Sequence, residues 1–288
     1  MAIWNLGSIN ADLVYAVPHI PEPGETLSST DRATFMGGKG ANMSVAIARA
    51  GSRINHIGAL GPDGDWAQKR LLEYGVDTQH IAQVDTATGH AIIMVDEHGE
   101  NAILLHAGAN GEVPQTALQT ALSEAQTGDW FVTQNETNLQ RTGASLAKKM
   151  GLKVAYAAAP FSAERVQAVL EHLDFLILNE VEAAQLTEAT CKTPNALGVR
   201  DVVVTLGGDG ADWFGPEGKQ HFDALPVTPI DTTGAGDTFT GYLLAGLDQG
   251  MPMAQAINMA TKAGALMVTR KGTADVIPDL SEVRAFNG

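Results

Sequence analysis

Asp231-Thr-Thr-Gly-Ala-Gly-Asp-Thr-Phe-Thr-Gly241 is the most informative stretch of this 288-residue sequence. A short, mostly apolar run precedes it, and Phe239-Thr-Gly-Tyr-Leu-Leu-Ala-Gly-Leu247 has the spacing of a buried helix. The stretch is therefore predicted to be a loop that opens a helix. Because Gly234 and Gly236 have no Cβ, a phosphate can approach the backbone closely, where the first helical turn leaves its N–H groups unpaired.

Asp237 lies among these predicted donors. A carboxylate in that position is kept ionised by the helix dipole and by hydrogen bonds, and it can accept a proton from a substrate hydroxyl. The alternative is helix capping after a glycine turn, which is the commoner role of Asp in an isolated Gly-x-Gly-Asp. The full string is far more specific, and it is not a Walker A loop, because the chain has no Gly-Lys-Ser/Thr.

The full string resembles the signature near the C-terminus of the ribokinase-like carbohydrate kinases, the pfkB family. The resemblance implies that Asp237 is the catalytic base and that Gly234, Ala235 and Gly236 form the catalytic anion site beside it. It covers nearly the whole chain, with a second strong signature at residues 37–42 and a weaker one at 179–182. Within the family, the resemblance is closest to the ribokinase branch.

Composition limits the class of protein. A length of 288 residues with 44% hydrophobic content suits one large α/β domain, 1–288. The 18 Lys+Arg against 33 Asp+Glu give a net charge of -15, which disfavours nucleic acid and anionic membranes as partners. The single Cys191 excludes an internal disulfide, and no Cys/His cluster has metal-ligand spacing. Without a basic leader or an apolar run of roughly 18 residues, we expect a cytoplasmic protein.

Polar side chains follow the first predicted strand, at residues 2–6. Asn10 and Asp12 lie in Gly7-Ser-Ile-Asn-Ala-Asp12, and open α/β sheets bind ligands at the carboxyl ends of their strands. Asn and Asp are also ordinary turn formers, so the position alone leaves both roles open. The resemblance implies that Asn10 and Asp12 bind the sugar.

A second glycine-rich loop, Met36-Gly-Gly-Lys-Gly-Ala-Asn42, leads into a helix predicted at 43–51. The resemblance implies that its Gly38, Lys39 and Asn42 line the sugar pocket. The alternative is a close helix-sheet contact that merely requires glycine. Glu136, after a strand predicted at 130–133, is implied to hold a sugar hydroxyl, with a solvated loop carboxylate as the alternative.

Short strands predicted at 13–17 and 27–35, with a hairpin whose arms are 91–95 and 102–106, indicate a second, small sheet. The hairpin arms are apolar at consecutive positions, so both faces of this sheet need covering. We expect a β-lid formed by segments near 11–36 and 88–107. One face would close over the sugar and the other would join a homodimer, as the resemblance also implies.

Strands predicted at 154–159, 175–178 and 202–205 indicate an α/β fold, a doubly wound and mostly parallel sheet flanked by helices. Asn179 and Glu182 follow one of these strands and share a helical face, so both can aim at the water shell of Mg²⁺. An Asn-x-x-Glu box also caps helices well. The resemblance implies the magnesium role for this pair.

The remaining site predictions come from the resemblance. It implies nucleotide contacts at Asn179, Thr205, Gly207, Gly210 and Gly236, although strands that end in glycine turns are common in α/β proteins. It also implies a monovalent cation site, whose ligand positions are Asp231, Thr233, Met267, Arg270 and Gly272. Two departures weaken this transfer: Thr261 or Lys262 stands near the place of an adenine-proximal Asn, and Val276 replaces a polar cation ligand.

The combined prediction is a kinase that uses ATP and Mg²⁺, with K⁺ as a further cofactor, to phosphorylate a primary hydroxyl of a small sugar. Ribose, giving ribose 5-phosphate, is the expected substrate. Fructose, 2-keto-3-deoxygluconate or a nucleoside are alternatives, and a non-catalytic sugar sensor is a further one. A dinucleotide-dependent oxidoreductase is disfavoured, because no Gly-x-Gly-x-x-Gly follows the first strand.

Overall fold

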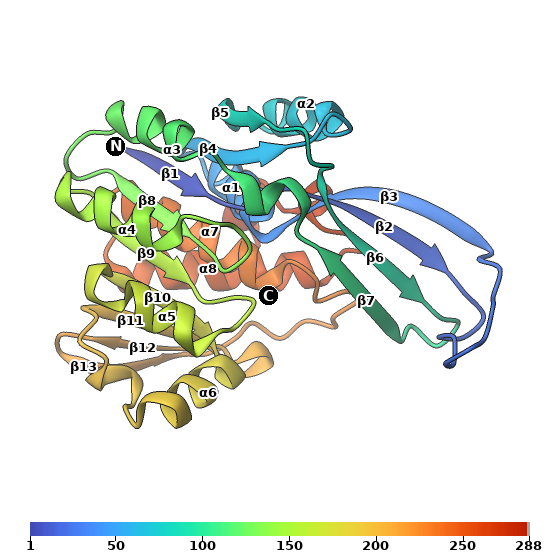
Figure 1. Ribbon diagram of the computed structural model, residues 1–288. Helices are drawn as coiled ribbons and strands as arrows, with labels where there is room; N and C mark the ends of the chain where they lie inside the picture. Colours follow the sequence, from blue (N-terminus) through green and yellow to red (C-terminus); the bar gives the residue numbers. More distant parts are fainter. Residues whose placement is uncertain (287–288) are drawn as a thin grey trace.

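The computed structural model describes residues 1–286 and has a nine-stranded central sheet with helices on both faces (Figure 1). The strand order is β13-β12-β11-β10-β9-β8-β1-β4-β5. Neighbours from β11 through β5 are parallel, while β12 and β13 form an antiparallel hairpin at one edge. The strands are β1 Ala2–Leu6, β4 Arg53–Leu60, β5 Asp77–Gln83, β8 Trp130–Thr133, β9 Lys153–Ala157, β10 Phe175–Asn179, β11 Asp201–Thr205, β12 Ala211–Gly215 and β13 Gly218–Phe222.

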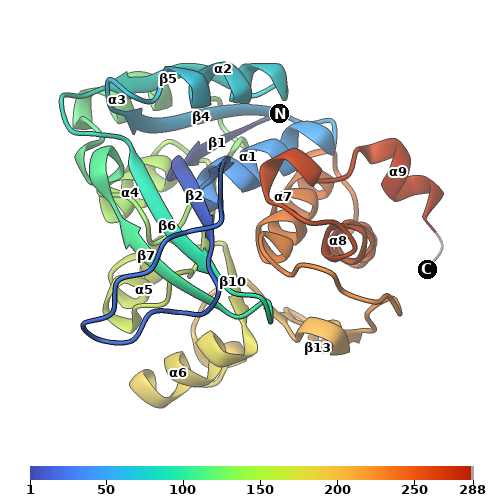
Figure 2. The same ribbon diagram turned by 90° about the vertical axis from the view of Figure 1, so that its right-hand side faces the viewer.

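The helices form two layers, which Figure 2 shows on either side of the sheet. One layer contains α1 Lys39–Arg49, α2 Asp65–Glu73, α7 Ala235–Asp248, α8 Met253–Val268 and α9 Leu280–Ala285. The other contains α3 Gln115–Ser123, α4 Gln140–Lys149, α5 Ala163–Val169 and α6 Glu180–Thr190. Each layer covers its own apolar core, and in β1 the side chain of Ile3 enters one core while Trp4 and Leu6 enter the other. The predicted doubly wound fold is confirmed.

A second sheet of four strands, in the order β3-β2-β6-β7, projects from one end of the central sheet (Figure 1). Strands β2 and β6 pair in parallel, and the two outer pairs are antiparallel. The strands are β2 Asn10–Ala16, β3 Asp31–Gly37, β6 Gly89–Val95 and β7 Asn101–His106. The small sheet therefore contains the predicted segments, although β3 begins at Asp31 rather than at residue 27. Its action as a lid stays a prediction.

Helix α1 begins four residues earlier than the sequence pattern indicates, at Lys39 rather than at 43. Its N-cap is Gly38, whose φ of 91° is a left-handed conformation that favours glycine. A Cβ at this position would lie 2.8 Å from the carbonyl oxygen of Ser8. The early start places Lys39 and Asn42 in the first turn, on one face of the helix.

The elements that were not predicted include two edge strands and one helix. Strand β5 reads Asp-Thr-Gln-His-Ile-Ala-Gln, and β13 reads Gly-Lys-Gln-His-Phe with exposed residues up to Phe222. Both lie at the edges of the central sheet, where only part of a strand needs to be apolar. Helix α4, which starts from the left-handed Leu139, was missed because its sequence Gln-Arg-Thr-Gly-Ala-Ser is polar at the start.

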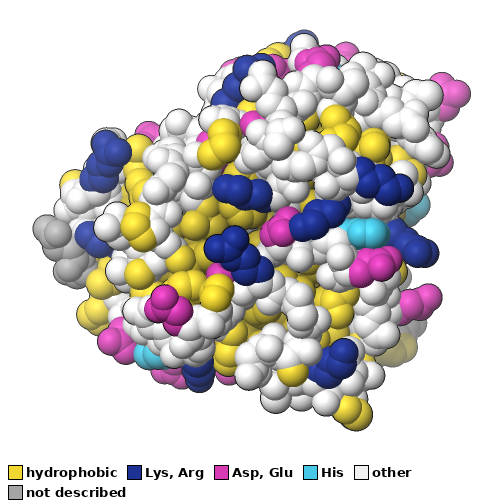
Figure 3. All heavy atoms as spheres, turned by 90° about the vertical axis from the view of Figure 1, so that its left-hand side faces the viewer, with side chains coloured by type: hydrophobic (Ala, Val, Ile, Leu, Met, Phe, Trp, Pro, Cys, Tyr) yellow, Lys and Arg dark blue, Asp and Glu magenta, His cyan; other side chains and the backbone are white. Residues whose placement is uncertain are grey.

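On the face opposite the small sheet, the Lys and Arg side chains of the described residues are spread out among acidic and apolar ones (Figure 3). This distribution agrees with a chain whose net charge is -15. Within residues 1–286, no helix combines the length and the hydropathy that crossing a membrane requires.

Candidate active site

Charged side chains from five segments lie close enough to alter one another's pKa at the carboxyl end of the central sheet. The lysine contributes a positive charge and the acids surround it: Lys39, Asp12, Glu136, Glu182 and Asp237. They come from α1, β2, the loop after β8, α6 and α7, so they are far apart in sequence. Most of the side chains predicted for sugar binding and catalysis thus meet in one place.

Asp237 is in the first turn of α7 and is 8% exposed. Its Oδ2 accepts a hydrogen bond of 2.9 Å from Nδ2 of Asn42, which fixes the carboxylate. Among residues 1–286, its other oxygen, Oδ1, has no hydrogen-bond partner. One oxygen is therefore held in place while the other is free to take a proton.

The N-terminus of α7 also leaves backbone donors free. The helix follows Gly234, whose φ is 74°, and within the described chain the N–H groups of Gly236 and Asp237 have no acceptor. A Cβ on Gly236 would meet no atom within 4 Å, so the space in front of this backbone is open. Free N–H groups at the start of a 14-residue helix can bind a phosphate.

Burial raises the pKa of Asp237 to about 6, although Lys39 and the hydrogen bond from Asn42 lower it. Burial also raises the pKa of Asp12 to about 7, with repulsion from Glu136 and Asp237 adding to the effect. The pKa of Lys39 is raised, chiefly by Asp237, against the opposing effect of burial. A base with a pKa near 6 can be unprotonated at neutral pH and still accept a proton.

Glu136 is held by two donors from separate segments. Oγ of Ser8 and the backbone N–H of Lys39, at 3.1 Å, both donate to its Oε2. Ser8 is fully buried at the end of β1, and the sequence analysis did not identify it. The only local signal was its place in the Gly-Ser-x-Asn stretch, because the contact with Glu136 spans 128 residues.

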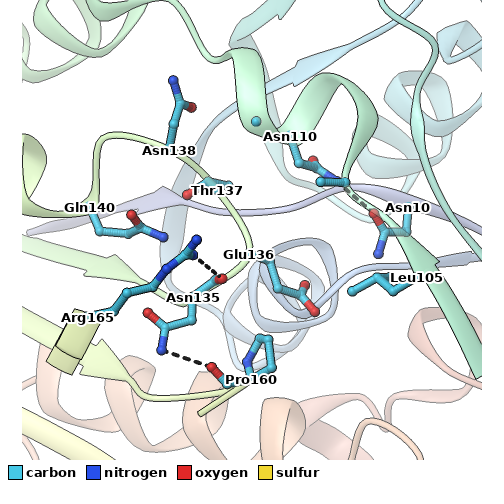
Figure 4. A pocket seen from close by; sticks show the side chains of 12 residues that line it. Asn10, Leu105, Asn110, Asn135, Glu136, Thr137, Asn138, Gln140, Pro160 and Arg165 are labelled. Carbon is cyan, nitrogen blue, oxygen red and sulfur yellow. Dashed lines mark hydrogen bonds between the residues drawn. The ribbon is translucent and has the colours of Figure 1, made fainter. Parts of the chain in front are cut away.

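A cavity of about 430 Å³ opens beside Glu136 (Figure 4). Asn10 lines it, together with Leu105 at the end of β7 and Arg165 in the first turn of α5. Nδ2 of Asn110 donates to Oδ1 of Asn10 at 2.7 Å. No role was predicted for Asn110 or Arg165 from the sequence, although Asn110 ends the string His106-Ala-Gly-Ala-Asn110, which is part of the family resemblance.

Asn179 and Glu182 form a reciprocal capping box at the start of α6. The backbone N–H of Glu182 donates to Oδ1 of Asn179, and that of Asn179 donates to Oε2 of Glu182, both at 2.8 Å. Burial raises the pKa of Glu182, while the N–H of Asn179 and the charge of Lys39 lower it. The capping role of this pair is therefore present in the structure. Oε1 of Glu182 has no hydrogen-bond partner within residues 1–286, so it can still bind another group.

A second cavity, of about 360 Å³, lies between the β11 end and α7. Thr205, Gly207, Gly210 and Gly236 line it as predicted for nucleotide contacts, whereas Asn179 is absent from its described lining. Most of the other walls are apolar: Ala224, Leu225, Pro226, Val227, Phe239 and Val268. These walls suit the flat ring system of a nucleobase. The free N–H groups of α7 suit the phosphates of the same nucleotide.

The structure separates the two residues near the predicted adenine position. Thr261 lines the second cavity. Nζ of Lys262 instead donates to the backbone oxygen of Phe286 at 2.8 Å.

The residues predicted to hold a monovalent cation lie in the loop before α7 and at the end of α8 with the loop that follows it. Oδ1 of Asp231 accepts from the N–H of Thr233 at 2.9 Å, and its Oδ2 accepts from the N–H of Gly272 at 3.1 Å. Met267 is buried beside Gly234. The Arg270 side chain donates to the carbonyl oxygen of Val276 at 3.2 Å and to Oε1 of Glu282 at 2.6 Å. Among residues 1–286, no cluster of three or more His, Cys, Asp or Glu could hold a metal.

Comparisons with known proteins agree with this arrangement. The family model described as pfkB family carbohydrate kinase matches residues 3–280. The chain is 35% identical to the ribokinase of Haemophilus influenzae, over 98% of this chain and 96% of that one. Its structure is similar to that of the ribokinase from Cryptococcus neoformans var. grubii in complex with ADP, with a TM-score of 0.84, 32% identity and 99% of both chains covered. It is also similar to Arabidopsis thaliana ribokinase complexed with ribose and ATP, with a TM-score of 0.86, 28% identity and coverage of 99% and 98%.

Proposed function

Since the chain belongs to the pfkB family of carbohydrate kinases and is thereby a phosphotransferase with an alcohol group as acceptor, we propose that it transfers the γ-phosphoryl group of ATP to the primary hydroxyl of ribose. The product is ribose 5-phosphate. The observation that carries the proposal is the buried Asp237 at the start of α7, with one oxygen fixed by Asn42 and free N–H groups beside it.

The proposed chemistry uses Asp237 as a general base. Its free Oδ1 takes the proton of the sugar hydroxyl as the hydroxyl oxygen bonds to the γ-phosphorus and the bond to ADP breaks. Phosphoryl transfer depends mostly on positioning and electrostatic stabilisation, so the N–H groups of Gly236 and Asp237 supply the second contribution. The positive charge of Lys39 lies near Asp237 and lowers its pKa, which keeps the base available.

The sugar is proposed to occupy the first cavity, with its primary hydroxyl toward Asp237. Asn10 and Glu136 line that cavity, and Asp12, Lys39 and Asn42 all lie near Asp237. The small sheet contributes Asn10, Asp12 and Leu105, so a sheet that moves toward the central domain covers the sugar. This is the proposed lid.

ATP is proposed to occupy the second cavity, with its base against the apolar walls and its phosphates at the start of α7. Mg²⁺ would then be held through water by Oε1 of Glu182, with Asn179 beside it, and it would neutralise charge on the phosphates. A water-mediated site fits a chain whose described residues form no direct metal-binding cluster.

Potassium is proposed as an activator bound by backbone groups of the two loops that Asp231 joins to Gly272. It would stiffen the turn that precedes α7. Because ATP chemistry needs a compartment that holds ATP, the proposal includes a cytoplasmic location.

A homodimer through the small sheet completes the proposal. In β7, Ile103, Leu104 and Leu105 are 61%, 64% and 48% exposed, which is unusual for three consecutive large apolar side chains. A two-fold contact between two such sheets would cover the apolar face that does not meet the sugar.

The direct test is the formation of ADP from ATP by the purified protein, with and without sugar. Ribose should trigger ADP formation, and mass spectrometry should identify a pentose phosphate. Deoxyribose, fructose, 2-keto-3-deoxygluconate and a nucleoside form the comparison panel. If one of these compounds has a higher kcat/KM than ribose, that compound replaces ribose as the proposed substrate. If no sugar leads to ADP formation, the kinase assignment is refuted.

A further inference from the structure

Asn110 lies directly behind the sugar-binding residue Asn10. It belongs to the 3₁₀ helix Gly108–Glu112, which follows β7, and it is only 2% exposed. Its Oδ1 accepts from the backbone N–H of Ile9 at 2.9 Å, and its Nδ2 donates to the oxygen of Ile9 at 3.2 Å. This two-point clamp leaves no freedom in the orientation of its amide.

The clamp also determines the orientation of the Asn10 amide. The second hydrogen of Asn110 Nδ2 points at Asn10, over a distance of 2.7 Å, and only an acceptor can meet it. Asn10 must therefore present Oδ1 to Asn110. Its Nδ2, which has no partner within residues 1–286, then faces the cavity, and Figure 4 shows this nitrogen turned away from Asn110.

The absence of a side chain at Gly89 leaves the space in which the two amides meet. Gly89 is the register partner of Asn10 in β6. A Cβ at Gly89 would lie 2.1 Å from Nδ2 of Asn110 and 2.6 Å from Oδ1 of Asn10. Any larger residue would displace the bond, so the chain keeps this space for the two amides.

We propose that Asn110 is a positioning residue that fixes Asn10 as a hydrogen-bond donor toward the substrate. The pocket then selects sugars that bring a hydroxyl oxygen, an acceptor, to this point. An analogue without that oxygen leaves the Asn10 donor unpaired, which lowers affinity. This inference rests on the proposed sugar kinase function, because it assumes that the cavity binds the sugar.

A double-mutant cycle tests the coupling. Asn10→Ala and Asn110→Ala should each raise the KM for ribose about 3- to 10-fold, the range for one lost neutral hydrogen bond, with a smaller effect on kcat. If Asn110 acts through Asn10, the double variant should have the KM of Asn10→Ala. Both single variants should also lose discrimination against the same sugar, 2-deoxyribose or 3-deoxyribose. Effects that multiply in the double variant would overturn the inference.

Asn138 offers a matched control. It clamps the backbone of Val113 in the same way, with two bonds of 3.0 Å, and it lines the same cavity, but it does not contact Asn10. The effects of Asn138→Ala and Asn10→Ala should therefore be independent. If Asn138→Ala couples to Asn10→Ala as strongly as Asn110→Ala does, the loss of any side chain on this wall has the same effect. The inference would then fail.

The orientation of Asn10 can also be read without any sugar. In ¹⁵N-labelled protein, the side-chain amide hydrogens of Asn10 should exchange quickly with water, and those of Asn110 slowly. Asn110→Asp keeps the acceptor for Ile9 but replaces the donor by a carboxylate oxygen, so the Asn10 amide should turn and become protected. A protected Asn10 amide in the wild type would overturn the inference. A wild type that makes no ADP with any sugar would refute the proposed function alone.

Discussion

At the scale of single residues, the site concentrates acids around one lysine. Asp12, Glu136 and Asp237 all influence Lys39 or one another, and burial raises the pKa of both aspartates. The two aspartates nevertheless differ in their contacts. Asp237 has a fixed partner in Asn42 and donors nearby, whereas the carboxylate of Asp12 has no hydrogen-bond partner within residues 1–286. We therefore expect different consequences when each loses its charge.

Asp237→Asn should lower kcat by about 10²- to 10⁴-fold, the usual contribution of a general base, and should change the KM for the sugar much less. The amide keeps the shape and the contact with Asn42, so the fold should persist. Asp248→Asn is the matched control, because Asp248 is also buried but lies at the other end of α7. A kcat above about a tenth of the wild-type value in Asp237→Asn would contradict the assignment.

Asp12→Asn should stabilise the protein at alkaline pH. The pKa of Asp12 is about 7 when folded, against 3.8 ordinarily, so the folded state binds the proton more tightly. The free energy of unfolding therefore falls as pH rises from about 4 to about 7. Replacing the carboxylate removes this penalty, and at pH 8 the variant should gain about 2 to 4 kcal/mol. Urea unfolding at pH 8 and pH 5 should show a smaller gain at the lower pH.

Asp129 gives the contrast. It is also buried, but it accepts hydrogen bonds from the N–H groups of Ala2, Trp4 and Gln126. Asp129→Asn should therefore destabilise the protein at pH 8. If Asp12→Asn also destabilises at that pH, its carboxylate makes favourable contacts that outweigh the cost of burial.

At the scale of elements, helix starts provide most of the site. Helix α1 supplies Lys39 and Asn42, α6 supplies Glu182, and α7 supplies Asp237 with its free N–H groups. Each first turn leaves unpaired donors, which side chains or a ligand must satisfy. In α6 a capping box pairs the N–H groups of Asn179 and Glu182. In α7 the N–H groups of Gly236 and Asp237 have no acceptor within the described residues. The two helices thus offer a carboxylate and an anion site to the same region.

Glu182→Gln separates capping from metal binding. Glutamine can replace glutamate in a capping box, so the melting temperature should change little. The lost charge should instead raise the Mg²⁺ concentration needed for half-maximal activity. Glu182→Ala, which removes the cap as well, should cost about 0.5–2 kcal/mol of stability. An unchanged Mg²⁺ requirement in both variants would leave α6 capping as the only role of Glu182.

The sequence predicted elements whose signals are local, and it missed contacts that are not. The string at 231–241 predicted the start of α7, and the hairpin pattern predicted β6 and β7. The bonds from Ser8 to Glu136 and from Asn110 to Asn10 span 128 and 100 residues. The string His106-Ala-Gly-Ala-Asn110 carries part of the family resemblance, but no periodicity or capping rule predicts which residue Asn110 or Ser8 contacts. Residues 224–227, which line the second cavity, were not predicted to do so, because they belong to no helix or strand.

At the scale of the whole molecule, the small sheet projects from the central sheet, and Met36 is the one residue of its four strands that belongs to either apolar core (Figure 1). Its strand β7 is an edge with large exposed side chains. An exposed apolar edge strand favours association with another chain. The net charge of -15 opposes association elsewhere on the surface.

Leu104→Asp should therefore disrupt a dimer. Light scattering of the wild type at micromolar concentration should give about twice the chain mass of 30.2 kDa, and the variant should give a lower mass. Leu72→Asp is the matched control, because Leu72 is 56% exposed but lies on α2. A monomeric wild type would refute the dimer, and an equal loss in Leu72→Asp would show that the charge acts nonspecifically.

The four strands of the small sheet all have one end at the pocket: β2 starts with Asn10, β3 ends at Gly37, β6 starts at Gly89, and β7 ends one residue before Ala107. If the small sheet acts as the proposed lid, it would rotate about the end that lies at the pocket. A seven-residue strand such as β2 is roughly 23 Å long, so a rotation of about 10° at its root moves the far tip by roughly 4 Å. The tip travels far while Asn10 hardly moves. Access to the proposed sugar site would thus change greatly with little displacement of the groups proposed to recognise the sugar.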